Sequence, residues 1–348
     1  MKIIVDSHIP NIRGKIEPRA EVVYLEPGDI TREAVRDADA LIVRTRTRCD
    51  AALLDGSRVG FIGSATIGTD HIDLDYCGSH GITVRNAPGC NAPAVAQWVF
   101  CAITAWMRHR GLSSPAGLTL GIVGVGHIGS IVARWGRELG FTVLLNDPPR
   151  ENMENVETGE NREKMGDCSI DGIFSPLDEL QRRCDIITFH TPLTRDGQWP
   201  TWHLCDQAFL DGLDHCRLII DAARGPIADN AALLGWHGDV ALDCWENEPN
   251  ISRELLEKAI VATPHIAGYS AEGKQRGTAM MLEALNGFYG WDIPVPEIAA
   301  PATGAPDVTL EGIAASYDIM ADTAALKADA AAFEPLRNTY RHRPEYRH

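Results

Sequence analysis

Three side chains suited to acid–base work on a small acid each follow an apolar run in this sequence. Arg224 lies in Asp-Ala-Ala-Arg-Gly-Pro, Glu248 in Asp-Cys-Trp-Glu-Asn-Glu-Pro, and His265 in Thr-Pro-His-Ile-Ala-Gly. A guanidinium binds a carboxylate through two parallel hydrogen bonds, an imidazole accepts a hydroxyl proton, and a carboxylate orients that imidazole and stabilises its protonated form. Singly, each could be a surface ion pair, a solvated loop residue or a turn cap. Together they predict a catalytic set for oxidising a 2-hydroxy acid, provided that a hydride acceptor is bound nearby.

A glycine-rich turn upstream predicts the site of that acceptor. Its glycines have G-x-G-x-x-G spacing and stand between an apolar run over 120–123 and a helical pattern over 127–139. In a dinucleotide site the first glycine makes a tight turn, the second lets the backbone approach a pyrophosphate, and the third lets helix and strand pack closely. The helix N-terminus offers unpaired N–H groups to the phosphates. The residues predicted to contact the cofactor here are Gly124, Gly126, His127, Ile128 and Gly129.

Asp147 indicates which dinucleotide is bound. It ends the next apolar run, 18 residues past Gly129 (147 − 129), where a carboxylate accepts hydrogen bonds from ribose hydroxyls. Its charge would repel a 2′-phosphate, so it predicts NAD rather than NADP. Arg150 leaves NADP open, because a nearby arginine can accommodate that phosphate.

The elements that position these groups alternate between strand-like and helix-like patterns. Strands are predicted at 3–5, 22–25, 40–43, 60–62 and 82–84, and then at 120–123, 143–147, 186–189, 218–221, 240–242 and 259–262. Helical patterns lie near 31–38, 51–54, 92–107 and 271–289. This alternation predicts an α/β fold with two doubly wound parallel-sheet, Rossmann-like domains. Ligands of such sheets bind beyond the carboxyl ends of the strands, where Arg224, Glu248 and His265 stand.

The predicted domain organisation is discontinuous. Residues 1–91 with 265–292 form the expected substrate-binding domain, 92–264 the NAD-binding domain, and 293–348 a proline-rich linker with a C-terminal segment. That tail is too small to fold alone, so we expect it to pack on another part of the chain or on a second subunit. Glu151–Asp171 lacks periodicity and is expected to be a solvated loop.

The composition excludes several classes of function. A formal net charge of −16 argues against a nucleic-acid-binding or anionic-membrane surface, so an anionic substrate needs a local basic pocket. The nine cysteines have no C-x-x-C pair and no metal-ligand spacing, which predicts reduced thiols in a cytoplasmic protein without a structural metal. The 92–107 stretch is too short and too polar to span a bilayer, and we expect a buried helix there.

These motifs are similar to the signatures of the D-2-hydroxyacid dehydrogenase family. Asp-x-x-Arg-Gly, Asp-x-x-x-x-Glu-Pro and Thr-Pro-His-Ile-Ala-Gly carry the resemblance, and further marks lie at 43–47, 63–71, 87–91, 146–150 and 265–274. The chain most resembles the members that oxidise 4-phospho-D-erythronate, and this likeness continues into the tail at Leu336-Arg337-Asn338-Thr339-Tyr340. The resemblance implies NAD-dependent oxidation of the C2 hydroxyl to 2-oxo-3-hydroxy-4-phosphobutanoate, an early step towards pyridoxal 5′-phosphate. It also implies a homodimer joined through the C-terminal segment.

The resemblance assigns residues as well. It implies Arg224, Glu248 and His265 as catalytic residues. At the substrate it implies Thr45, Thr66 and Tyr269. Near NAD it implies Asp147, Thr191, Ala222, Ala223, Arg224, Asp243 and Gly268.

Arginines suggest where a phosphorylated substrate would bind. Arg44, Arg46 and Arg48 alternate after the predicted strand at 40–43, so they share one face if that strand continues. In an acidic protein this is a local basic site, and Arg44 and Arg46 are expected to line a phosphate pocket. The alternative is a solvated edge strand. A second basic cluster, expected to be a solvated terminus rather than to reach a partner's site, comprises Arg337, Arg341, Arg343 and Arg347.

Two other functions stay open at this point. One is another D-2-hydroxyacid dehydrogenase, for instance one acting on 3-phosphoglycerate, although this tail does not resemble the regulatory extensions of such enzymes. The other is an NAD-sensing, corepressor-like binding protein, which fold alone does not exclude.

Overall fold

The computed structural model of the protein describes residues 1–154, 174–298 and 308–346. The chain forms two compact units. Unit 1 consists of Met1–Asn91 and Ser270–Ala300, and unit 2 of Ala92–Tyr269 and Pro301–His348. These bounds differ from the predicted ones in two respects: His265 and the four residues after it lie in unit 2, and so does the described part of the tail.

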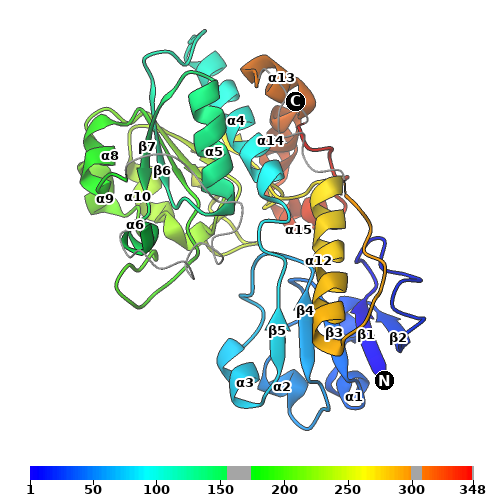
Figure 1. The fold of residues 1–348 in the computed structure, drawn as a ribbon. Helices are drawn as coiled ribbons and strands as arrows, with labels where there is room; N and C mark the ends of the chain where they lie inside the picture. Colours follow the sequence, from blue (N-terminus) through cyan, green and yellow to red (C-terminus); the bar gives the residue numbers. More distant parts are fainter. Residues whose placement is uncertain (155–173, 299–307, 347–348) are drawn as a thin grey trace. The chain divides into compact units, whose positions relative to one another are not determined.

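Unit 1 contains a five-stranded parallel sheet in the order β2-β1-β3-β4-β5 (Figure 1). Its strands are β1 (Lys2–Asp6), β2 (Glu21–Leu25), β3 (Ala40–Val43), β4 (Phe61–Ser64) and β5 (Thr83–Arg85). Ile3, Ile4 and Val5 are fully buried because side chains cover both faces of the sheet. A strand buried on both faces has a continuous apolar sequence rather than an alternating one. Each predicted strand of this unit is present to within two residues.

Helices cover both faces of this sheet. They are η1 (Pro27–Asp29), α1 (Arg32–Val35), α2 (Ala51–Leu54), α3 (Leu74–Ser79) and α12 (Ala271–Tyr289). Met281, Leu282 and Leu285 of α12 pack against Ile3 and its neighbours, and α12 runs along the sheet in Figure 1. The Ser270 side chain accepts the Gly273 N–H and caps the start of this helix.

Unit 2 contains a six-stranded parallel sheet in the order β11-β10-β9-β8-β6-β7. Its strands are β6 (Thr119–Val123), β7 (Thr142–Asn146), β8 (Ile186–Phe189), β9 (Leu218–Asp221), β10 (Asp239–Leu242) and β11 (Val261–Ala262). β6 pairs with both β7 and β8, so the turn after β6 lies where the strand order reverses. Doubly wound sheets bind ligands at such a point. The two parallel sheets confirm the predicted fold class.

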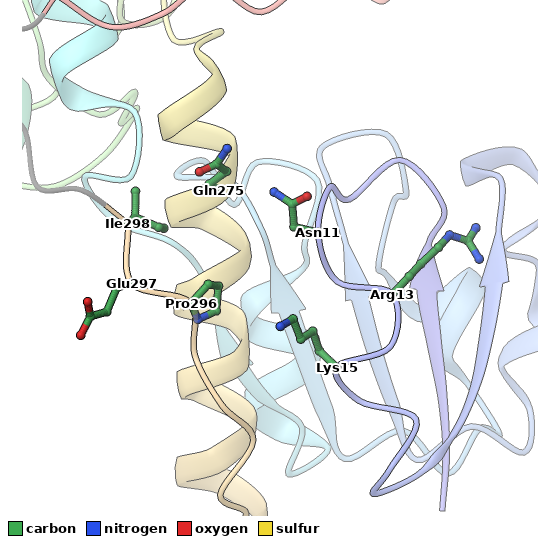
Figure 2. A pocket seen from close by; sticks show the side chains of 7 residues that line it. All are labelled: Asn11, Arg13, Lys15, Gln275, Pro296, Glu297 and Ile298. Atoms are coloured by element: carbon green, nitrogen blue, oxygen red, sulfur yellow. The ribbon is translucent and has the colours of Figure 1, made fainter.

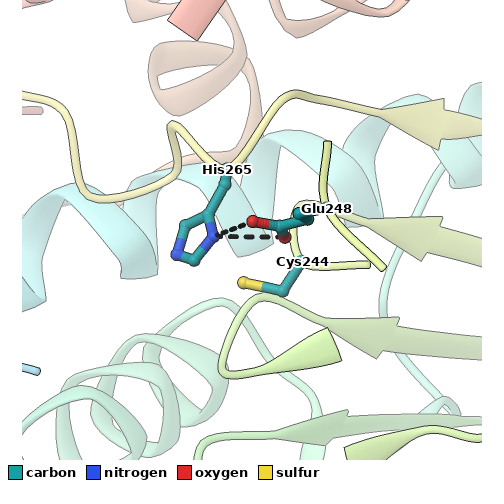
Figure 3. A group of neighbouring side chains, drawn as sticks. All are labelled: Cys244, Glu248 and His265. Atoms are coloured by element: carbon teal, nitrogen blue, oxygen red, sulfur yellow. Dashed lines mark hydrogen bonds and ion pairs between the residues drawn. The ribbon is translucent and has the colours of Figure 1, made fainter. Parts of the chain in front are cut away.

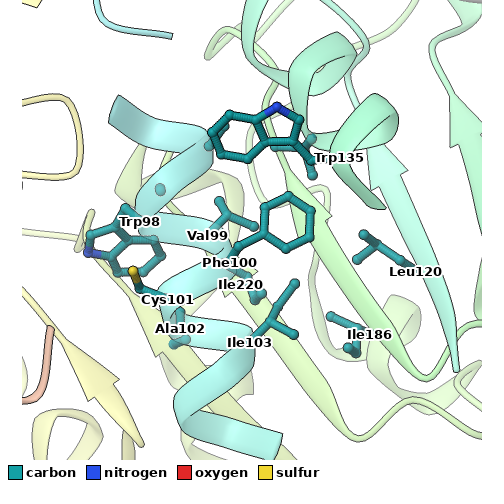
Figure 4. Packing of buried hydrophobic residues seen from close by; sticks show 14 of the residues in the cluster. Trp98, Val99, Phe100, Cys101, Ala102, Ile103, Leu120, Trp135, Ile186 and Ile220 are labelled. Atoms are coloured by element: carbon teal, nitrogen blue, oxygen red, sulfur yellow. The ribbon is translucent and has the colours of Figure 1, made fainter. Parts of the chain in front are cut away.

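α4 (Ala92–His109) is central to the core of unit 2. Trp98, Phe100 and Ile103 are fully buried in one cluster with Leu120 of β6. Figure 4 shows Phe100 and Ile103 on the side of the helix that faces Leu120. The buried helix predicted here is therefore present. Within the described ranges, no helix is long and apolar enough to cross a membrane.

The other helices of unit 2 include one that replaces part of a predicted loop. They are α5 (His127–Glu138), α6 (Pro148–Glu154), α8 (Leu177–Arg183), α9 (Gln207–Asp211), η2 (Gly225–Ile227), α10 (Asn230–Gly235) and α11 (Arg253–Lys258). The prediction of a loop over 151–171 is wrong at its start, because α6 continues through Glu154. Asp147 caps this helix by accepting the Arg150 N–H. The rest of that predicted loop lies outside the described residues.

The tail is an integral part of unit 2. Its elements are α13 (Leu310–Ser316), α14 (Ile319–Ala328), η3 (Ala330–Ala332) and α15 (Phe333–Asn338). α13 packs on α4, and α14 packs on β11. Leu326 and Phe333 are fully buried in the core cluster on the second face of the sheet. The tail therefore buries much of its apolar surface within its own chain.

Candidate active site

The glycine turn after β6 has the geometry of a dinucleotide-binding loop. Gly124 has φ +89°, and a Cβ there would lie 2.8 Å from the backbone of His190 and Thr191. A Cβ on Gly129 would lie 2.0 Å from the Gly124 oxygen, so helix and turn pack without room for a side chain. A Cβ on Gly126 would meet nothing within 4 Å, which leaves open space beside the backbone. This is the division of roles that a pyrophosphate-binding turn requires.

Asp147 follows β7 and is bonded to the same turn. Its Oδ2 accepts the Val125 N–H at 2.8 Å. The guanidinium of Arg150 is buried and donates to the Val125 carbonyl and, at 3.3 Å, to the Ser130 hydroxyl. Arg150 therefore uses its guanidinium to hold the turn rather than to accommodate a 2′-phosphate, and this position favours NAD over NADP.

Two polar atoms beside the turn lack partners among the described residues. They are the Thr191 hydroxyl and Nδ1 of His190, both buried. Burial lowers the pKa of His190 to about 3, so its ring is neutral. An unpaired buried hydroxyl is costly, and Thr191 therefore suits a polar ligand such as a nucleotide. The turn, Asp147 and Thr191 together fit a dinucleotide.

Parallel neighbours β9, β10 and β11 bring the predicted catalytic residues to one edge of the sheet. Ala222, Ala223 and Arg224 follow β9, Glu248 lies beyond β10, and His265 lies beyond β11. Nη1 of Arg224 donates to the Ala223 carbonyl at 2.7 Å. The next residue, Gly225, touches the loop before Glu248: a Cβ on Gly225 would lie 2.1 Å from the Trp245 carbonyl carbon. The Arg224 segment and the Glu248 loop are thus in direct backbone contact.

Glu248 and His265 form a hydrogen-bonded pair (Figure 3). Nδ1 of His265 lies 2.9 Å from Oε2 and 3.2 Å from Oε1 of Glu248, and the ring turns Nε2 away from the carboxylate. Oε1 also accepts the Trp245 N–H at 2.9 Å. Burial alone would raise the pKa of Glu248, but the charge and hydrogen bond of His265 and the Trp245 N–H outweigh burial, so this pKa lies below its usual range. An ionised Glu248 orients the ring and leaves Nε2 to exchange a proton with a ligand.

Cys244 lies beside this pair, and the three side chains have the donor types of a metal site. Burial raises the pKa of the Cys244 thiol well above its usual range, so the thiol keeps its proton. Metal ligation requires a thiolate, and Nδ1 of His265 is bonded to Glu248. The geometry therefore favours an acid–base pair over a metal centre.

A second cluster with the donor types of a metal site comprises His203, Asp229 and Glu246, and it was not predicted from the sequence. His203 has Nε2 2.8 Å from Oε1 of Glu246 and Nδ1 3.6 Å from Oδ2 of Asp229. Glu246 also accepts the Asn230 N–H at 3.0 Å. With both ring nitrogens facing carboxylates, His203 ties the segment after Arg224 to the loop before Glu248.

Asp243, which the resemblance places near NAD, is bonded to the segment that carries His265. Its carboxylate is 1% exposed and accepts hydrogen bonds from the Thr263 hydroxyl at 2.5 Å, the Ile266 N–H at 2.8 Å and the Ala267 N–H at 2.9 Å. Burial raises the pKa of Asp243, while His265 and these donors oppose the rise. The residue holds the His265 segment in place. Gly268 follows that segment and is half-buried.

The arginines after β3 do not share a strand face, so that prediction is wrong. β3 ends at Val43, because the Thr47 N–H bonds the Arg44 carbonyl and bends the chain into a turn. Nε of Arg44 donates to the buried Asp6 at 3.0 Å, and Nε of Arg48 donates to its neighbour Asp50 at 2.7 Å. Thr45 and Arg46 occupy the exposed part of the turn. In the same unit, Thr66 shares a 2.8 Å hydrogen bond with the Ser64 hydroxyl.

The expectation of a solvated arginine tail is wrong for two of its members. Arg343 is 6% exposed and donates to the carbonyls of Ile266 and Ala267. Arg337 donates from Nε to the Tyr269 hydroxyl at 3.3 Å. Arg341 is exposed, and Arg347 lies outside the described residues. Sequence reasoning missed these contacts because they join segments far apart in the chain.

A pocket within unit 1 does not coincide with any predicted site. Asn11, Arg13, Lys15, Gln275, Pro296, Glu297 and Ile298 line it (Figure 2). None of these residues belongs to the predicted substrate set, and Arg13 is stacked on the Tyr24 ring at 3.9 Å. We assign no role to this pocket.

Residues 94–267 match the family described as "D-isomer specific 2-hydroxyacid dehydrogenase, NAD binding domain". The chain is 45% identical to an erythronate-4-phosphate dehydrogenase of Bacteroides fragilis, with 98% of this chain and 96% of that protein covered. The protein of the same name from Porphyromonas gingivalis is 39% identical, with 98% and 93% covered. A D-lactate dehydrogenase of Aquifex aeolicus, solved with NAD and lactic acid, has a TM-score of 0.67 and 23% identity over 83% of this chain and 96% of that one, which shows a shared fold.

Proposed function

The chain belongs to the D-isomer-specific 2-hydroxyacid dehydrogenases and, among them, to the erythronate-4-phosphate dehydrogenases, and from that premise we propose that it oxidises 4-phospho-D-erythronate at the C2 hydroxyl. The product is 2-oxo-3-hydroxy-4-phosphobutanoate, an intermediate on the route to pyridoxal 5′-phosphate. One observation carries the chemistry: Glu248 binds Nδ1 of His265 at 2.9 Å and leaves Nε2 to act on a hydroxyl.

NAD is the cofactor, and it supplies the hydride acceptor when bound. The turn from Gly124 to Gly129 has open space beside Gly126 for a pyrophosphate, and Asp147 stands at the end of the next strand for ribose hydroxyls. The other residues proposed to line the cofactor are Thr191, Ala222, Ala223, Arg224 and Gly268. Asp243 contributes through the His265 segment, since its own oxygens accept hydrogen bonds from that segment.

The protein's own residues manage the carboxylate and the proton. Arg224 binds the substrate carboxylate through its planar guanidinium. His265 accepts the C2 hydroxyl proton at Nε2, and the ionised Glu248 stabilises the imidazolium that forms. The same groups return the proton when a 2-oxo acid is reduced.

The substrate phosphate is proposed to bind the turn after β3. Thr45 and Arg46 are exposed there, while Arg44 is held by the buried Asp6 and supports the turn from below. Thr66 and Tyr269 are the remaining proposed substrate contacts. In a chain of net charge −16, these arginines provide the local positive potential that a phosphorylated acid needs.

The test is turnover on a matched set of acids. NADH formation would be measured with 4-phospho-D-erythronate, D-erythronate, 3-phosphoglycerate and D-lactate. A parallel assay would supply a 2-oxo acid acceptor, because a tightly held cofactor would hide free NADH. We expect preference for 4-phospho-D-erythronate, lost in His265→Ala with thermal stability retained.

The other outcomes are distinct. Activity confined to another acid would keep the reaction and reject the substrate. NAD binding without turnover in either assay would reject an enzyme and favour a cofactor-sensing protein.

We also propose a cytoplasmic homodimer. The eight cysteines of the described ranges are all buried, unbridged thiols, which suits a reducing compartment. Met320 on α14 is 46% exposed, and we use it to probe contact between the tails of two copies. Light scattering of the wild type and of Met320→Lys tests the dimer, and fractionation of cells tests the compartment.

A further inference from the structure

Arg337, in the tail motif that the mechanism above does not use, lies beside the catalytic pair. Its Nη1 is 3.9 Å from Oε2 of Glu248, and its Nε donates to the Tyr269 hydroxyl at 3.3 Å. The side chain is 17% exposed, so water screens this charge weakly. The Arg337 guanidinium thus contacts both Glu248, the carboxylate that orients His265, and Tyr269, a proposed substrate contact.

Two anchors hold Arg337 against the segment that carries His265. Phe333, four residues earlier on α15, is fully buried in the core. On α14, the Thr323 hydroxyl accepts the Ala262 N–H of β11 at 3.2 Å, three residues before His265. The position of Arg337 is therefore fixed by packing and not by its charge alone.

We propose that Arg337 is a positioning residue that holds Glu248 ionised and correctly oriented towards His265, so that the C-terminal tail completes the active site within one chain. The inference rests on the proposed function. It assigns Arg337 no contact with the reacting atoms: Arg337 acts through Glu248 and, at the other end of its guanidinium, through Tyr269.

The charges around Glu248 support this role. Burial raises the pKa of Glu248, and His265, the Trp245 N–H and Arg337 together bring it below its usual range. Titratable groups near the pair include Cys244 and Asp243, and those near Arg337 include Tyr269 and Glu334, the last of which lies 3.5 Å from Nη1 of Arg337. Without Arg337 the site keeps its negative charges and loses a cation, so the pair takes up a proton at higher pH.

The test is the pH dependence of kcat/KM in Arg337→Gln. We expect its acid limb to move to higher pH by about one unit, the usual effect of removing one nearby opposite charge. kcat should fall because the residue positions a catalytic group, and any rise in KM through Tyr269 should be the same for 4-phospho-D-erythronate and D-erythronate. Arg337→Lys should restore most of the acid limb, since it keeps the cation. Glu334→Gln should move the limb in the opposite direction, because it leaves Arg337 uncompensated.

Arg341→Gln is the matched control, since it removes an exposed tail arginine of the same charge. Thermal melts would establish that each variant folds. An Arg337→Gln profile that coincides with that of Arg341→Gln would overturn the inference. So would a rise in KM for 4-phospho-D-erythronate without one for D-erythronate, because that result would make Arg337 a phosphate ligand. Absence of turnover in the wild type would instead reject the proposed function.

Discussion

The carboxylate of Asp243 lies 2.8 Å from the backbone nitrogen of Ile266, one residue after the catalytic histidine. The same carboxylate accepts the Ala267 N–H and the Thr263 hydroxyl, so it holds both sides of His265. His265 has φ +56°, a left-handed conformation that costs a non-glycine residue about 1 kcal/mol or more. The buried Asp243 holds the backbone in this conformation and thereby directs the imidazole towards Glu248.

Asp243→Asn tests this relationship. In this variant one carboxylate oxygen becomes an NH₂ group. An NH₂ group cannot accept the hydrogen bonds that the oxygen accepts in the wild type, so buried donors lose their partner. We expect the free energy of unfolding in urea to fall by about 2 kcal/mol, together with a loss of kcat. Asp214→Asn, at an exposed position, should change stability by less than about 0.5 kcal/mol. Equal changes in the two variants would contradict a role for Asp243.

Replacing Gly126 or Gly129 with alanine should have different effects: the first on NAD affinity and the second on stability. A Cβ on Gly126 meets nothing within 4 Å, so Gly126→Ala should keep its melting temperature and bind NAD at least tenfold more weakly, about 1.4 kcal/mol. A Cβ on Gly129 would lie 2.0 Å from a backbone oxygen, so Gly129→Ala should lose about 1–3 kcal/mol of stability. Thermal melts and NAD titrations separate the two. Normal NAD affinity in Gly126→Ala would show that the cofactor does not approach this turn.

Arg46→Ala should weaken recognition of the phosphate selectively. We expect kcat/KM for 4-phospho-D-erythronate to fall by at least tenfold, and that for D-erythronate to change little, because a lost charged contact costs about 1.5–3 kcal/mol. Arg48→Ala is the control, since that side chain is 83% exposed and pairs with Asp50. Equal losses on both acids in Arg46→Ala would mean that the turn does not bind the phosphate.

The buried Asp221 should make the stability of the folded protein depend on pH. Burial raises its pKa to about 8, against about 3.9 in an unfolded chain. Between these values the folded protein holds a proton that the unfolded chain has released, so this group's contribution to stability is lost as pH rises from about 4 to 8. Asp221→Asn cannot ionise, and its melting temperature relative to the wild type should rise between pH 5 and pH 8. A difference that stays constant with pH would show that Asp221 is already ionised at pH 5.

The local features of the fold were predictable because they depend on short stretches of sequence. The central strands of the two sheets, such as β3 and β9, are largely apolar runs, and the glycine turn has fixed spacing. α3 was missed because it is six residues long and contains Gly78, although Asp73 carries an N-cap signal in the sequence. The arginines at 44, 46 and 48 do not share a strand face because β3 ends at Val43, as predicted, and one backbone bond, from the Thr47 N–H to the Arg44 carbonyl, then turns the chain.

The catalytic pair was predictable from its motifs, but its surroundings were not. Arg337 reaches Glu248, and Arg343 reaches Ile266, from far along the chain. No local pattern distinguishes these two arginines from the exposed Arg341. Their roles depend on the packing of Phe333 and Leu326, which becomes visible only in the folded structure.

The buried guanidinium of Arg343 gives the active site an order of assembly during protein synthesis. Its carbonyl partner Ile266 is translated 77 residues earlier, so the ribosome makes the catalytic histidine well before the residue that fastens its segment. At typical rates of about 5–20 residues per second, several seconds separate the two events. During that interval the nascent chain has its whole glycine turn and the Asp243 contacts to the His265 segment, but it lacks the Arg343 bonds to Ile266 and Ala267. The last bonds to this segment therefore form only once the tail has been made and has folded back onto unit 2.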